Sequence, residues 1–212
     1  MTDYERLYTG LSHAAWGYFL LHFNFNLNVD STSINILPSF AGALLLLSAV
    51  NKLSAERRDL KLLRPLCMIL AAWHLADWLL ALAGTSLTGK ILFLDLIFTA
   101  VLLYFHFQFL TDMAAIAEKY QPEEETLNRR ILRRRTVLLV LATIADVASG
   151  LFQAADLGQM MKMEMPFGLL TIALGVLLAV TLIVIVMIVF SLFQLRRYVR
   201  NWGEAEPPFP AE

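Results

Sequence analysis

The chain has few cysteines and few charges, and these scarcities narrow what it can be. Its one cysteine, Cys67, cannot form an intramolecular disulfide, so cysteine usage gives no information about the redox compartment. Charged residues make up 17% of the chain, against about 25% in average globular proteins. The net charge is only −1, and no nucleic-acid partner is expected.

The chain also lacks recognisable catalytic signatures. It contains no HExxH or GxSxG motif, no paired-glutamate protease motif and no aspartate-rich alcohol-phosphotransferase pattern. The first apolar run lacks a small-residue cleavage motif, so a cleavable signal peptide is not expected. An enzyme is therefore not the favoured interpretation, and no cofactor can be named from the sequence.

Long apolar runs fill most of the chain. Hydrophobic residues make up 58% of it, against about 45–50% in ordinary globular chains. Each run is near the roughly 20 residues that cross about 30 Å of hydrocarbon. We predict membrane-spanning helices over residues 7–26, 36–53, 65–83, 90–116, 136–157 and 166–195. The predicted fold is all-α, a single six-helix bundle over residues 1–203 with a disordered cytoplasmic tail, 204–212.

Basic residues are segregated between the two sides of this predicted bundle. Of the 17 Lys and Arg residues, only Lys90 and Lys162 fall on one side. The others lie at the N-terminus, in the second and fourth connections and after the sixth run. By the positive-inside rule, both termini are predicted to be cytoplasmic in a multi-pass protein of the cell membrane.

A weak internal repeat accompanies this topology. The six runs divide into three hairpins of similar length, and Ala76-Asp77 recurs as Ala145-Asp146. Repeats are common in transporters, so three pseudo-repeated helical hairpins are one interpretation of this pattern. A chance match of two aspartates and some alanines stays open as the alternative.

The start of the second run carries a short motif. The segment Ile34-Asn35-Ile36-Leu37-Pro38-Ser39-Phe40-Ala41-Gly42 follows a polar, aromatic first run. It resembles the opening of the second helix in small uncharacterised multi-pass membrane proteins of clostridia-like bacteria. The resemblance covers about a fifth of the chain; it implies a bacterial cell membrane and no particular activity. From the residues themselves, Pro38 suits a first helical turn and Gly42 permits close approach of a neighbouring helix.

Ionisable residues inside the apolar runs are the best functional candidates. Such a residue at mid-bilayer costs at least about 2.5–3.5 kcal/mol and usually faces the bundle interior. His74 and Asp77 share one helical face, and Asp95 and His106 fall on one stripe of the fourth run. Estimated depths place the candidates around a pocket open to the outside and walled by the first, third, fourth and fifth runs. The candidates are His74, Asp77, Asp95 and Asp146, with His22 and His106 secondary.

We therefore predict an integral membrane protein that binds or transports a small polar solute or cation through this pocket, with proton coupling by the carboxylates. One alternative is a non-catalytic accessory or assembly subunit of a membrane complex. Another is a haem- or metal-binding protein, because all four histidines lie in apolar runs. The polar residues would also serve to join helices, through hydrogen bonds worth about 0.6 kcal/mol on average.

The fourth connection is strongly basic. Pro122 and the glutamates after it resemble the first turn of a helix. The basic residues that follow are predicted to anchor the topology and to contact anionic lipid headgroups, or to dock a soluble protein partner. They are Arg129, Arg130, Arg133, Arg134 and Arg135.

Overall fold

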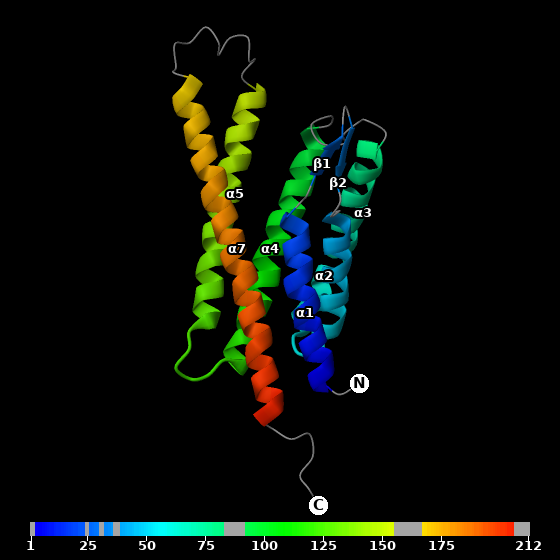
Figure 1. The fold of residues 1–212 in the computed structure, drawn as a ribbon, viewed down its shortest axis with the longest axis vertical. Helices are drawn as coiled ribbons and strands as arrows, with labels where there is room; N and C mark the ends of the chain where they lie inside the picture. Colours follow the sequence, from blue (N-terminus) through cyan, green and yellow to red (C-terminus); the bar gives the residue numbers. More distant parts are fainter. Residues whose placement is uncertain are drawn as a thin grey trace, which may run out of the picture.

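The structure, a computed structural model, is built almost entirely of α-helices (Figure 1). It describes residues 3–23, 26–29, 32–35, 39–82, 92–154 and 167–205. The helices are α1 (Asp3–His22), α2 (Ser39–Leu53), α3 (Leu63–Leu82), α4 (Leu92–Tyr120), α5 (Leu127–Ala154) and α7 (Phe167–Ala205). A 3-10 helix, η1 (Arg58–Leu62), leads into α3, and strands β1 (Asn26–Val29) and β2 (Thr32–Asn35) form an antiparallel hairpin. The predicted all-helical architecture is confirmed, with this hairpin as an addition.

The helix bounds differ from the predicted runs where polar residues flank the apolar ones. The first helix ends at His22, and Asn26, the last residue of the first predicted run, belongs to β1. Helix α5 begins at Leu127 and takes in the arginines ahead of the predicted run, so Pro122 precedes the helix and does not open it. Helix α7 continues to Ala205, past the predicted end at 195. Pro38 and the tail 206–212 lie outside the described residues.

Three helical segments are long and apolar enough to cross a membrane: Arg58–Leu82, Leu94–Tyr120 and Ile172–Glu204. Helix α2 is apolar but has only 15 residues. Helices α1 and α5 carry charged residues near their starts, which lowers their hydropathy. The six membrane crossings remain a prediction. The three pseudo-repeats also remain a prediction, since the helices range from 15 residues in α2 to 39 residues in α7.

Helix α4 runs through the middle of the molecule in Figure 1, with α1, α2 and α3 on one side and α5 and α7 on the other. The described ends of α1 and α7 lie at one end, together with the α2–α3 and α4–α5 connections. We call this the basic end, because it holds the arginine-rich connections. The hairpin lies at the opposite end, above the ends of α1 and α2.

The densest packing lies toward the basic end. Fully enclosed side chains there come from every helix, among them Leu11, Leu53, Leu63, Met113, Leu127 and Leu195. Toward the other end, α5 and α7 expose apolar side chains such as Val147 and Leu178, the latter 74% exposed. Such surfaces suit a hydrocarbon environment, which has no hydrophobic drive to bury them.

Small residues allow α1 and α2 to touch backbone to backbone. A Cβ added at Gly42 would lie 2.5 Å from the Leu21 nitrogen and 2.8 Å from the Gly17 carbonyl oxygen. The predicted close approach at Gly42 is therefore confirmed, with α1 as the neighbour. This contact fixes the position of α1, and with it the side chains at its far end.

Candidate functional site

Three aromatic, polar side chains converge where α1 meets α4. The Tyr18 hydroxyl lies 3.2 Å from Nδ1 of His106, and the His22 and His106 rings have centroids 5.0 Å apart. Tyr18 is fully enclosed and His106 is 4% exposed. We call Tyr18, His22 and His106 the histidine cluster. It places two imidazoles and a phenol together inside an apolar core.

Local helix geometry on α1 builds half of this cluster. Tyr18 and His22 are four residues apart, so they share one face of the helix. Nδ1 of His22 donates to the Tyr18 carbonyl oxygen at 2.9 Å, and the two rings lie 4.5 Å apart. This bond holds the ring so that Nε2 of a neutral His22 is left as a proton acceptor. The Tyr18 hydroxyl both donates and accepts, so its bond to His106 suits either tautomer of that ring.

Helix α3 adds a histidine and a carboxylate next to the cluster. His74 is close enough to His22 of α1 and to Asp77, one turn later on α3, for their charges to influence one another. Its ring meets Phe98 of α4 edge-on at 5.5 Å, and Trp73 stacks on the same Phe98 ring at 4.7 Å. The predicted His74/Asp77 pair is thus half-buried and linked to the α1–α4 contact.

The contact between His74 and Phe98 also shows where Asp95 lies along the length of the bundle. Helices α3 and α4 are antiparallel, and His74 faces Phe98. Three residues further toward the hairpin are Asp77 on α3 and Asp95 on α4, each about 4.5 Å beyond that contact. Two half-buried carboxylates therefore lie at one level, on the hairpin side of the histidine cluster.

Asp146 lies apart from the other candidates. It is exposed on α5, and α5 packs against α4 and α7. The candidates that the structure brings near one another therefore lie on α1, α3 and α4, and the outward-facing pocket stays a prediction. Periodicity placed Asp146 on a helix face but carried no information about which helix that face meets.

His13 is held separately from the cluster. It projects from another side of α1, and its Nδ1 lies 2.9 Å from Ser48 Oγ of α2. The four histidines thus divide into one that joins helices through a hydroxyl and three that lie around α1, α3 and α4.

The five arginines of the fourth connection divide into two groups. Arg134 donates to the Met187 carbonyl oxygen at 2.7 Å and also to Ser191 Oγ, joining α5 to α7. Arg135 donates to Thr111 Oγ1 at 2.5 Å and covers the Phe107 ring, joining α5 to α4. These two arginines join α5 to its neighbouring helices, and a lipid or partner contact by them stays a prediction.

The other three arginines remain at the surface. Arg129 and Arg133 are exposed, and Arg130 pairs with Glu125 at 2.6 Å with both side chains about two-fifths exposed. An exposed pair of this kind contributes little to stability. These three keep the predicted lipid or partner contact as a proposal.

The sequence reasoning missed Tyr18. Its position four residues before His22, in a run otherwise rich in aromatics, was the available signal. A phenol is neutral at pH 7, so the cost of burying a charge, which marks the aspartates, gives no signal at Tyr18.

The residues that the structure describes contain no group of three or more His, Cys, Asp or Glu side chains arranged to hold a metal ion. The haem- or metal-binding alternative therefore gains no support from the geometry.

Comparison with known protein families, curated proteins and solved structures finds no match for this chain. The site's own geometry is accordingly the basis for a functional proposal.

Proposed function

We propose that this protein is a six-pass protein of a bacterial cell membrane that binds a small cation or polar solute for transport, with both termini in the cytoplasm. Binding takes place where α1, α3 and α4 meet, and protons exchange on the imidazoles and carboxylates there. The observation that supports it best is the convergence of Tyr18, His22 and His106, with His74 and Asp77 beside them.

The choice of residue types favours binding over helix joining. An interhelical hydrogen bond is worth about 0.6 kcal/mol, and Ser, Thr or Asn would supply it without an ionisable group. His13 illustrates the simpler arrangement, because one imidazole and one hydroxyl suffice to join α1 to α2. The histidine cluster instead groups several ionisable side chains, which is typical of proton and ion pathways.

The test is flux through reconstituted protein. Proteoliposomes loaded with a pH-sensitive dye would be given a membrane potential and then exposed in turn to monovalent cations and small organic cations. We expect flux above that of empty liposomes, and we expect His106→Gln to reduce it at least about tenfold, equivalent to about 1.4 kcal/mol. Glutamine keeps a hydrogen-bonding group toward Tyr18, but its amide side chain does not take up a proton as an imidazole does.

His13→Gln is the matched control. It makes the same change at a half-buried histidine bonded to a hydroxyl elsewhere on α1, and flux should remain at the wild-type level. Equal losses of flux in the two variants would indicate that the histidine cluster contributes only to helix packing. Wild-type flux no greater than that of empty liposomes would remove the transport proposal.

One further observation also fits the accessory-subunit alternative. Along residues 172–183, α7 is exposed on nearly all sides, and the facing part of α5 is exposed at Val140 and Ile144. A partner helix would cover this surface as well as lipid does. Absent flux combined with specific co-purification of a membrane partner would favour that function.

A further inference from the structure

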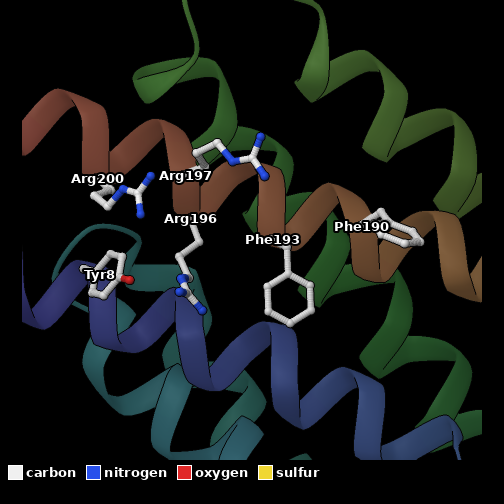
Figure 2. A pocket seen from close by; sticks show the side chains of 6 residues that line it. All are labelled: Tyr8, Phe190, Phe193, Arg196, Arg197 and Arg200. Carbon is white, nitrogen blue, oxygen red and sulfur yellow. The ribbon is translucent and has the colours of Figure 1, made fainter.

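A groove that the proposed function does not use lies between α1 and α7 near the basic end. Its volume is about 540 Å³, within the range of roughly 300–1,000 Å³ that is usual for ligand sites. Figure 2 shows its lining, with one residue from α1 and five from α7: Tyr8, Phe190, Phe193, Arg196, Arg197 and Arg200. We call this the arginine groove.

Aromatic rings hold one of its arginines in place. Arg196 points from α7 toward α1 in Figure 2, and its guanidinium lies 5.0 Å from the Tyr8 ring centre and 5.9 Å from that of Phe193. Cation–π contacts of this kind orient a guanidinium without neutralising it. Its planar set of N–H donors stays free to bind an oxyanion.

Positive charge exceeds negative charge around the groove. Arg200 lies 3.8 Å from Glu204 one turn later, but both side chains are at least half exposed, so the pair is weak. Neither Arg196 nor Arg197 makes an ion pair within the described residues. On the α1 side, Glu5 lies one turn before Tyr8. An anion would therefore meet guanidinium groups that are not already paired.

The lining also changes from apolar to basic along α7. Phe190 is 69% exposed and Phe193 is half-buried, whereas the three arginines follow toward the basic end. From Phe190 to Arg200 the helix rises by about 15 Å. This order matches a molecule with an anionic head and an apolar chain, as membrane lipids have.

We propose that the arginine groove binds an anionic phospholipid. Arg196 and Arg200 hold the phosphate, Arg197 lies at the rim, and Phe193 and Phe190 receive the start of an acyl chain. Guanidinium groups match phosphate geometry through paired N–H donors. The membrane location favours a lipid over a soluble phosphate, because Phe190 extends the groove along the apolar surface.

The test compares lipids on the purified full chain. Native mass spectrometry in a neutral detergent would measure binding of phosphatidylglycerol and of phosphatidylcholine with the same acyl chains. We expect the wild type to prefer phosphatidylglycerol. The Arg196→Gln/Arg200→Gln variant should bind it about tenfold more weakly, because it loses two charge-assisted contacts, and should bind phosphatidylcholine as before.

The controls separate a built site from general surface charge. Arg58→Gln/Lys61→Gln removes two exposed basic residues at the same end, outside the groove, and should leave binding unchanged. Equal weakening by this control, or no preference by the wild type, would overturn the proposal. Soluble sn-glycerol 3-phosphate competing as well as the lipid would also overturn it, in favour of a soluble phosphate. Where the double variant does not fold, the absence of a lipid preference in the wild type would still overturn the proposal.

Discussion

At the scale of single residues, the burial of a charged side chain determines how much its ion pair contributes to the stability of the fold. Asp112 of α4 is fully enclosed; it accepts a hydrogen bond from Gln108 Nε2 at 3.0 Å and lies 3.8 Å from Arg57 Nε. Arg57 precedes η1, so this contact ties the α2–α3 connection to the middle of the bundle. An enclosed carboxylate depends on such a cation, since an unpaired buried charge is costly.

Removing the cation should therefore destabilise the fold. We expect Arg57→Gln to lower the free energy of unfolding by about 1–3 kcal/mol, less than for a fully buried pair because Arg57 is 41% exposed. The neighbouring exposed Arg58 provides the control, and Arg58→Gln should change stability by less than about 0.5 kcal/mol. Unfolding by sodium dodecyl sulfate, followed by tryptophan fluorescence, would measure both. Similar effects in the two variants would contradict the assignment.

At the scale of helices, close packing of α1 against α2 supports the candidate site. Gly17 and Gly42 face each other across this contact, and each lies against the other helix's backbone. Backbone atoms cannot move aside as a flexible side chain can, so an added methyl group forces the helices apart. Any displacement of α1 also displaces Tyr18 and His22.

Gly42→Ala should accordingly reduce stability by about 1–3 kcal/mol. Gly175 on α7 is the matched control, because an added Cβ there meets nothing within 4 Å. Gly175→Ala should be neutral or stabilising by up to about 1 kcal/mol, as alanine is the better helix former. The same detergent unfolding would measure both, and a stabilising Gly42→Ala would show that α1 and α2 do not touch as described.

At the scale of the whole molecule, the fold places the two described ends and the arginine-rich connections at one end. An even number of membrane crossings would give this arrangement, and the positive-inside rule predicts that this end is cytoplasmic. Cys67 is fully buried, so the native chain should react little with thiol-labelling reagents.

Single introduced cysteines would test the orientation. In a Cys67→Ala background, a membrane-impermeant maleimide added to intact cells should label Lys90→Cys and leave Asn201→Cys unlabelled. Inverted vesicles should give the opposite pattern. The native chain is the control for reaction at Cys67. Labelling of both introduced cysteines from the same side would contradict the six-pass arrangement.

Much of the helical architecture followed from apolar runs alone, because a hydrocarbon environment demands long segments whose backbone groups are satisfied internally. The antiparallel pair of β1 and β2 was missed, since a polar stretch between two apolar runs is typical of a loop. The helical continuation to Ala205 was also missed, because hydropathy ends before the basic turns that still extend the helix.

Hydropathy and charge patterning predict the approximate helices, the segregation of basic residues and the ionisable side chains inside the apolar runs. Which of these side chains meet depends on the tertiary packing. It joined His22 to His106 through Tyr18, assigned Arg134 and Arg135 to helix joining, and left Asp146 exposed. The physical reason is that helical periodicity specifies the face on which a residue lies, whereas the neighbour of that face depends on how whole helices pack.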